Sequence, residues 1–197
     1  MMKKKSMNSI CVFCSSSNSI DNTFFQTAID LGHMIGELGL ELIYGGANIG
    51  LMGEVARATH EKGGRVIGVI PEFFRKKDKN IEYIEADELI IAETMRIRKA
   101  IMDERADAFI VLPGGIGTLE EAIEIMSMKQ LGLTDKPLAF VNTNNFYDSL
   151  ISNFQMMVGL QFAKSSIMGL FEVCPNPSSA LEFILSYKSG KKDNKYL

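Results

Sequence analysis

The sequence has no tryptophan, only three cysteines and five prolines among its 197 residues, and no long apolar run. A helix that crosses a bilayer needs about 20 apolar residues in succession, so a membrane protein is not expected. The apolar stretch that follows the lysines at residues 3–5 is too short for a secretion signal. Three cysteines leave one thiol over in any disulfide pairing, which is typical of a reducing compartment. We therefore expect a cytoplasmic protein.

Basic charge is scarce in the body of the chain. Seven of the 21 Lys and Arg residues lie within residues 3–5 and 188–195, whereas only one of the 24 acidic residues does. The acidic excess between these ends argues against a nucleic-acid-binding face. Residues 1–8 and 188–197 are expected to be flexible basic ends, and residues 9–187 to form one globular domain.

Short apolar runs alternate with longer amphipathic segments along the chain. Strands are predicted at residues 9–14, 40–44, 65–70, 88–91, 108–112 and 136–142. Helices are predicted at residues 24–38, 51–62, 94–105, 118–131, 146–158 and 178–187, and a polar surface excursion at 72–85. This alternation predicts an α/β fold: one doubly wound, Rossmann-like parallel sheet with helices on both faces.

Ligands of such sheets bind beyond the carboxyl ends of the strands, which here are the loops at Ser15, Gly45 and Pro113. Residues 113–121 read Pro-Gly-Gly-Ile-Gly-Thr-Leu-Glu-Glu between a predicted strand and a predicted helix. Glycines let the backbone approach a ligand, and free N–H groups at a helix start suit a phosphate. The loop lacks the Gly-Lys-Ser/Thr of ATP-binding loops and the third glycine of dinucleotide-binding loops. Residues 45–53 form a second glycine loop, which is either another wall of the cleft or a tight turn with close helix packing.

The acidic residues that follow the first of these loops allow two interpretations. Thr118 and Glu121 have the spacing of a capping box, in which the carboxylate folds back onto the helix start. Alternatively, the Glu121 carboxylate lies one turn from a bound phosphate and faces the sugar of a nucleoside monophosphate. Glu120 and Glu124 are expected to be outward charges of the helix.

Two basic residues on the helix predicted at 94–105 are further candidates. Arg98 has no carboxylate among its helical neighbours, so it either extends to solvent or projects into a site. Lys99 has Asp103 four residues further on, which favours a surface ion pair. His33 and His60 lack partner ligands, so no metal site is predicted. The spacing of Cys11 and Cys14 would suit a redox pair only at a helix start, whereas Cys11 lies inside a predicted strand.

Three linked motifs occur in a specific order and spacing. Residues 45–53 fit G-G-x-x-x-G-L-M-G, residues 95–99 fit M-x-x-R-K, and residues 113–121 fit P-G-G-x-G-T-x-x-E. Together they resemble the Lonely Guy (LOG) family of nucleoside 5'-monophosphate phosphoribohydrolases, long mislabelled lysine decarboxylases. The resemblance implies a Rossmann-like homodimer that hydrolyses the N-glycosidic bond of AMP or of a cytokinin riboside 5'-monophosphate. The products would be free base and ribose 5-phosphate, and no cofactor would be required.

The resemblance also implies roles for individual residues. Arg98 and Glu121 take the positions of the catalytic pair. The substrate-binding positions are Gly46, Lys99, Gly114, Gly115, Ile116, Gly117, Thr118, Leu119, Glu120 and Ser127. Ser15 departs from the family pattern, because a glycine usually stands there, and a glutamate that the family often has upstream of M-x-x-R-K finds no clear match in residues 76–82.

The residue types suit this chemistry. Breaking an N-glycosidic bond builds positive charge on the ribose, which an ionised Glu121 would stabilise. Arg98 stays protonated, so it is expected to act electrostatically rather than as a proton donor. Decarboxylation with pyridoxal phosphate requires a Schiff-base lysine, and no lysine lies beside either glycine loop. The alternative function is a binding module that holds a nucleotide or a molybdopterin-type cofactor without turning it over.

Overall fold

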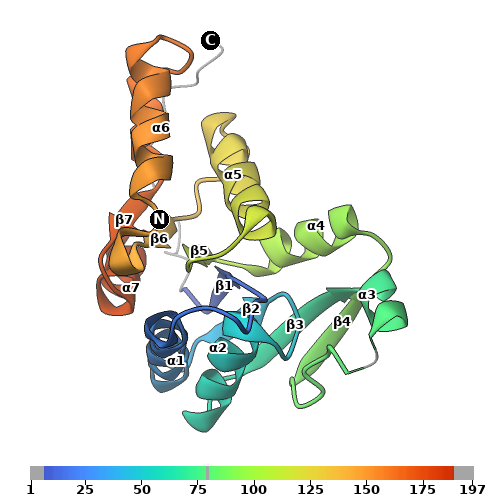
Figure 1. The fold of residues 1–197 in the computed structure, drawn as a ribbon. Helices are drawn as coiled ribbons and strands as arrows, with labels where there is room; N and C mark the ends of the chain where they lie inside the picture. Colours follow the sequence, from blue (N-terminus) through green and yellow to red (C-terminus); the bar gives the residue numbers. More distant parts are fainter. Residues whose placement is uncertain (1–6, 79, 189–197) are drawn as a thin grey trace, which may run out of the picture.

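A computed structural model describes residues 7–78 and 80–188, so that most of the basic ends predicted at 1–8 and 188–197 lie outside the described residues. Within the described residues, seven parallel strands form one sheet in the order β4-β3-β2-β1-β5-β6-β7 (Figure 1). The strands are β1 (Ser9–Phe13), β2 (Glu41–Tyr44), β3 (Val66–Pro71), β4 (Glu88–Ala92), β5 (Ala108–Val111), β6 (Leu138–Val141) and β7 (Glu172–Cys174). The predicted α/β fold with one parallel sheet is confirmed.

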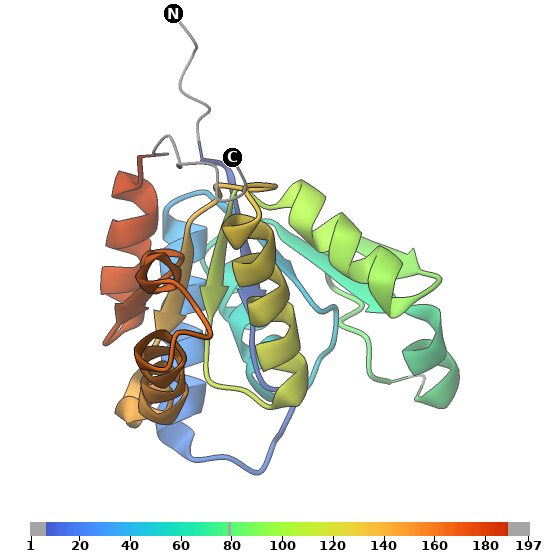
Figure 2. The same cartoon turned by 90° about the horizontal axis from the view of Figure 1, so that it is seen from above.

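Helices cover both faces of the sheet (Figures 1 and 2). The helices α1 (Asn22–Glu37), α2 (Gly50–Glu61) and α7 (Pro177–Ser186) pack on one face. The helices α4 (Met95–Arg105), α5 (Ile116–Gln130) and α6 (Asp148–Gly159) pack on the other. Each central strand is buried on both faces, because alternate side chains enter the two helical layers. Ile10 and Val12 belong to the first layer, and Cys11 and Phe13 to the second.

The strand order reverses at β1. The chain runs outward from β1 to β4, then returns through α4 to place β5 on the other side of β1, with Phe13 opposite Val111. The loops that leave β1 and β5 therefore emerge side by side at the carboxyl edge of the sheet. This edge is the ligand-binding position expected of a doubly wound sheet.

Three local predictions are corrected by the structure. The helix predicted from residue 118 begins at Ile116, because Gly115 is its N-cap. The excursion at 72–85 contains a short helix, α3 (Glu72–Lys77), whose largely exposed side chains give no helical stripe of buried residues. The strand β7 was not predicted, because it has only three residues and begins with the exposed Glu172. No helix among the described residues is long and apolar enough to cross a membrane.

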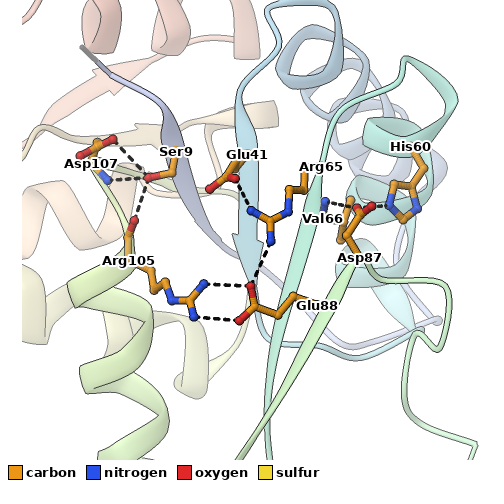
Figure 3. A network of polar contacts seen from close by, with 9 residues as sticks. All are labelled: Ser9, Glu41, His60, Arg65, Val66, Asp87, Glu88, Arg105 and Asp107. Carbon is orange, nitrogen blue, oxygen red and sulfur yellow. Dashed lines mark hydrogen bonds and ion pairs between the residues drawn. The ribbon is translucent and has the colours of Figure 1, made fainter. Parts of the chain in front are cut away.

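The amino edge of the sheet is joined by exposed and half-buried ion pairs (Figure 3). Arg65 contacts Glu41 at 2.6 Å and Glu88 at 3.2 Å. Arg105, at the end of α4, donates two hydrogen bonds to the Glu88 carboxylate, at 2.9 and 2.8 Å. These contacts join β2, β3 and β4 to the carboxyl end of α4.

Candidate active site at the carboxyl edge

Backbone hydrogen bonds join three loops at the carboxyl edge. The Ser15 N–H donates to the Pro113 carbonyl at 3.2 Å, and the Ser15 carbonyl accepts from the Leu51 N–H at 2.9 Å. The Gly50 N–H donates to Asn18 Oδ1 at 2.8 Å. The loop after β1 therefore lies between the two glycine loops and is bonded to both.

The glycine loop after β2 is a tight turn with close helix packing. Gly46 and Gly50 have φ values of 77° and 57°, which favour glycine. A Cβ atom on Gly50 would lie 2.4 Å from the carbonyl carbon of Ser16, and one on Gly45 would lie 2.4 Å from Arg98 Nη2. Because the first N–H groups of α2 are already bonded to the Ser15 loop, this helix start is not free to hold an anion.

The glycine loop after β5 differs, because its helix start is open. Gly115 caps α5 without a side-chain hydrogen bond, and the N–H groups of Ile116, Gly117 and Thr118 have no protein acceptor in the described part of the chain. Gly115 and Gly117 also face open space. Backbone N–H groups and the positive end of the helix dipole thus point toward an unobstructed position. We call Gly114–Thr118 the open helix start.

The capping-box interpretation of Thr118 and Glu121 is wrong. Thr118 is the third residue of α5 and not its N-cap. Its side chain packs against Gly114, because a Cβ atom on Gly114 would lie only 2.2 Å from Thr118 Oγ1. The Glu121 carboxylate instead bonds to Arg98, 23 residues earlier in the chain.

Arg98 and Glu121 form a buried ion pair. Arg98 Nη1 donates to Glu121 Oε1 at 2.7 Å, and Arg98 Nε donates to the Val69 carbonyl at 2.9 Å. The two residues are only 8% and 9% exposed. Burial raises the pKa of Glu121 above its ordinary value, and Arg98 opposes this shift. Arg98 therefore turns inward from α4 rather than extending to solvent.

Lys99 contacts the carboxylates of α5, so the predicted pair with Asp103 is wrong. Its ammonium contacts Glu120 and lies 2.8 Å from Glu124 Oε2. Asp103 pairs instead with Lys136 at 3.1 Å. Glu120 and Glu124 thus both face α4, although each remains partly exposed.

A groove of about 190 Å³ lies between α4 and α5. Lys99, Glu121 and Glu124 contribute polar side chains to it, and Phe13 and Met128 contribute apolar ones. Ion pairs join Arg98 and Lys99 of α4 to Glu121 and Glu120 in the turn of α5 that follows the open helix start, and of these residues Lys99 and Glu121 line the groove. Leu119 follows on the same turn of α5 and is half-buried. Ser127 is exposed and is not among the residues that line the groove.

Two contacts of this region were not predicted from the sequence. The Val69 carbonyl orients Arg98, yet a backbone acceptor leaves no mark on residue type. Gly45 belongs to a recognised motif, but the motif does not indicate that the Arg98 guanidinium packs against this glycine. No group of three or more possible metal ligands occurs in residues 7–78 and 80–188.

Fold and site together define a Rossmann-type α/β protein with an open helix start and a buried Arg–Glu pair beside its switch point. Residues 52–184 match a family described as "Possible lysine decarboxylase". The cytokinin riboside 5'-monophosphate phosphoribohydrolase LOG2 of Arabidopsis thaliana is 38% identical over 184 residues, which cover 93% of this chain and 85% of the relative. The probable phosphoribohydrolase LOGL6 of Oryza sativa subsp. japonica is 38% identical over 178 residues, covering 90% of this chain and 70% of the relative. The chain belongs to this family, the LOG family.

Solved structures show the same fold in more distant proteins. The molybdenum cofactor binding protein of Rippkaea orientalis is 22% identical, with a TM-score of 0.69, and the match covers 93% of this chain and 98% of that one. The molybdenum cofactor carrier protein of Chlamydomonas reinhardtii is 21% identical, with a TM-score of 0.68, covering 92% and 99%. At these identities the likeness shows the fold alone.

Proposed function

We propose that this protein hydrolyses the N-glycosidic bond of a nucleoside 5'-monophosphate, either AMP or a cytokinin riboside 5'-monophosphate. The products are the free base and ribose 5-phosphate. The observation that carries this proposal is the buried Arg98–Glu121 pair one turn from the open helix start of α5. The phosphoribohydrolase names of the relatives support the same reaction.

The open helix start binds the 5'-phosphate. The N–H groups of Ile116, Gly117 and Thr118 supply donors, and Gly114 and Gly115 let the phosphate approach the backbone. Anchoring the phosphate fixes the ribose beside Glu121, so that the scissile bond is held in one orientation.

Glu121 acts on the ribose and on the attacking water. Its carboxylate stabilises the positive charge that develops at the anomeric carbon as the base departs. Arg98 holds Oε1, which leaves Oε2 to accept a proton from water. The water oxygen bonds to the anomeric carbon as the N-glycosidic bond breaks, and the departing base takes a proton from solvent. A raised pKa makes Glu121 a stronger base than an ordinary glutamate.

Arg98 and Lys99 supply positive charge. Arg98 remains protonated, so it orients Glu121 and attracts the electron-rich leaving base without donating a proton. Lys99, held by Glu120 and Glu124, stands at the rim of the groove, where its ammonium can attract the nucleotide.

The test is release of base and ribose 5-phosphate from AMP and from a cytokinin riboside 5'-monophosphate by the wild type and by Glu121→Gln. Glutamine keeps the size of the side chain and removes its charge, so turnover is expected to fall by about a hundredfold or more. Glu37→Gln, which changes a surface pair on α1, is the matched control and retains full turnover. Full activity of Glu121→Gln would contradict the proposed role. If the wild type binds AMP and a cytokinin riboside 5'-monophosphate but releases no base from either, a nucleotide-binding module takes its place.

We further propose that the protein is a homodimer. Exposed apolar residues on α4, on α5 and directly after α5 supply the surface, namely Ile97, Ile123, Leu131 and Leu133. Sedimentation equilibrium is expected to give twice the chain mass. Replacing Ile123 and Leu133 by Asp is expected to give monomers, and a wild-type monomer at micromolar concentration would contradict the assignment.

A further inference from the structure

The crossover segment before β4, residues 80–87, pairs with the glycine loop after β2. The Asn48 N–H donates to the Ile81 carbonyl at 2.7 Å, and the Tyr83 N–H donates to the Gly46 carbonyl at 3.0 Å. These bonds flank an antiparallel bridge between Ala47 and residue 82. The glycine loop therefore has a partner on its outer side, and its position depends on where the crossover segment lies.

The Tyr83 side chain fixes the crossover segment to α2. It is 4% exposed, and its hydroxyl lies 2.8 Å from His60 Nδ1. His60 Nε2 lies 2.9 Å from Asp87 Oδ2, which also accepts the Val66 N–H at 2.8 Å (Figure 3). Because the Asp87 carboxylate can only accept a hydrogen bond, His60 Nε2 donates to it, and in this tautomer Nδ1 accepts the hydrogen bond of the Tyr83 hydroxyl. A chain of hydrogen bonds thus runs from the amino end of β3 to Tyr83.

The loop held in this way packs directly against Arg98. The missing side chain of Gly45 leaves the space that Arg98 Nη2 occupies, and Gly46 lies against the backbone of Val69. The Val69 carbonyl accepts the Arg98 Nε hydrogen at 2.9 Å. A shift of the loop by a fraction of an ångström would therefore change the direction of the guanidinium and, through it, of Glu121.

We infer that His60 and Tyr83 are positioning residues for the reaction: their hydrogen bond holds the crossover segment against the glycine loop, and the loop holds Arg98 in register with Glu121. The catalytic part of this inference rests on the proposed function. Neither side chain touches the substrate. Phosphate binding at the open helix start of α5 does not depend on them.

Two buried tyrosines allow a matched test. Tyr83→Phe removes the hydroxyl that bonds to His60 and also interacts with Glu85, whereas Tyr44→Phe removes one that has no hydrogen-bond partner among the described residues. Both side chains lie in the same apolar cluster. With AMP, Tyr83→Phe is expected to lower kcat by about tenfold or more while KM stays within about twofold. Tyr44→Phe is expected to leave both unchanged.

Substitutions at His60 separate its two hydrogen bonds. Asparagine places an amide near the position of Nδ1, so His60→Asn keeps an acceptor for Tyr83 and is expected to retain most of kcat. Glutamine places its amide near Nε2, so His60→Gln keeps the contact with Asp87 and is expected to lose as much as Tyr83→Phe. The double variant His60→Gln/Tyr83→Phe is expected to fall no further than Tyr83→Phe alone, because Tyr83→Phe already breaks the bond to His60.

Hydrogen exchange provides a readout that needs no catalysis. The amides of Asn48 and Tyr83 are expected to exchange at wild-type rates in Tyr44→Phe and His60→Asn, and at least tenfold faster in Tyr83→Phe and His60→Gln. Unchanged exchange in Tyr83→Phe would overturn the inference, as would an equal loss of kcat in Tyr44→Phe. A wild type that releases no base would overturn the proposed function alone, and the exchange rates would still decide whether this bond holds the loop.

Discussion

The two edges of the sheet use charge in opposite ways. At the carboxyl edge, Arg98 and Glu121 are almost fully buried and bond to each other and to a backbone carbonyl. At the amino edge, Arg65, Glu88 and Arg105 form a network whose side chains remain between 31% and 49% exposed (Figure 3). Arginine and glutamate side chains are thus partly exposed to solvent at the amino edge and buried in protein at the carboxyl edge.

This difference determines what each edge can tolerate. An exposed ion pair gains little, because water and salt compete with it, and it loses little when one partner is removed. A buried pair leaves an uncompensated charge when one partner is removed. The carboxyl edge therefore depends on each of its charges, a dependence that suits a site whose groups must stay in place. The amino edge joins strands and α4 without that dependence.

The largest expected effect is on stability at the carboxyl edge. Arg98→Met leaves Glu121 buried without its partner and is expected to lower the free energy of unfolding by about 3–5 kcal/mol. The double variant Arg98→Met/Glu121→Leu is expected to recover much of this loss, because no buried charge remains. Urea denaturation measures both. A loss below about 1 kcal/mol for Arg98→Met would remove the contrast between the edges.

A smaller effect is expected from filling the space beside Arg98. In Gly45→Ala, the new Cβ would lie 2.4 Å from Arg98 Nη2 and 2.7 Å from Met52 Sδ. Overpacking of this kind is expected to cost about 1–3 kcal/mol and to reduce turnover. Gly159→Ala, at the end of α6 with no neighbour within 4 Å of the added atom, is the control. Equal stability and activity in the two variants would show that the guanidinium has room to move.

The two edges should also respond to pH with opposite sign. Burial raises the pKa of Glu121 above 4.5, so its contribution to stability is complete below the unfolded pKa and is lost as pH rises through the folded pKa. Hydrogen bonds from Arg105 hold the pKa of Glu88 below 4.5, so its contribution is present at neutral pH and is lost as pH falls. Relative to wild type, Glu121→Gln should gain stability as pH rises, and Glu88→Gln should lose it. Urea titrations at several pH values test this, and slopes of equal sign would contradict it.

The smallest expected effect is at the amino edge. Glu88→Gln weakens the contacts to Arg65 and Arg105 and is expected to cost no more than about 1 kcal/mol at neutral pH, less in high salt. Thermal unfolding in low and high salt gives the value. A salt-independent loss as large as that of Arg98→Met would mean that the network is as indispensable as the buried pair.

The sequence predicted the strands that build the site, and it placed the motifs at the correct edge. Runs such as residues 9–14 are apolar on both faces, because they cross a sheet covered by helices on both sides, and this pattern is local. The short β7 was missed because three residues at the sheet margin carry too little periodicity. The start of α5 was placed two residues late, because Gly115 caps it through backbone conformation rather than through a side chain.

The partners of the charged residues were not predictable in the same way. Glu121 was assigned two roles, and the one based on local spacing is wrong, because its actual partner comes from another helix. Lys99 likewise pairs with α5 and not with Asp103 on its own helix. Helical spacing reports only neighbours on one helix, whereas these contacts depend on how α4 and α5 meet.

By itself, the sequence determined the alternation of strands and helices, the single parallel sheet and the two glycine loops at its carboxyl edge, because periodicity and glycine placement are local properties of the chain. Only the tertiary structure decided which loop stays open. The helix start after β2 is closed by hydrogen bonds to the loop of Ser15 and Asn18, whereas the one after β5 remains free. Two loops of similar composition differ because their neighbours in space, which are distant in sequence, differ.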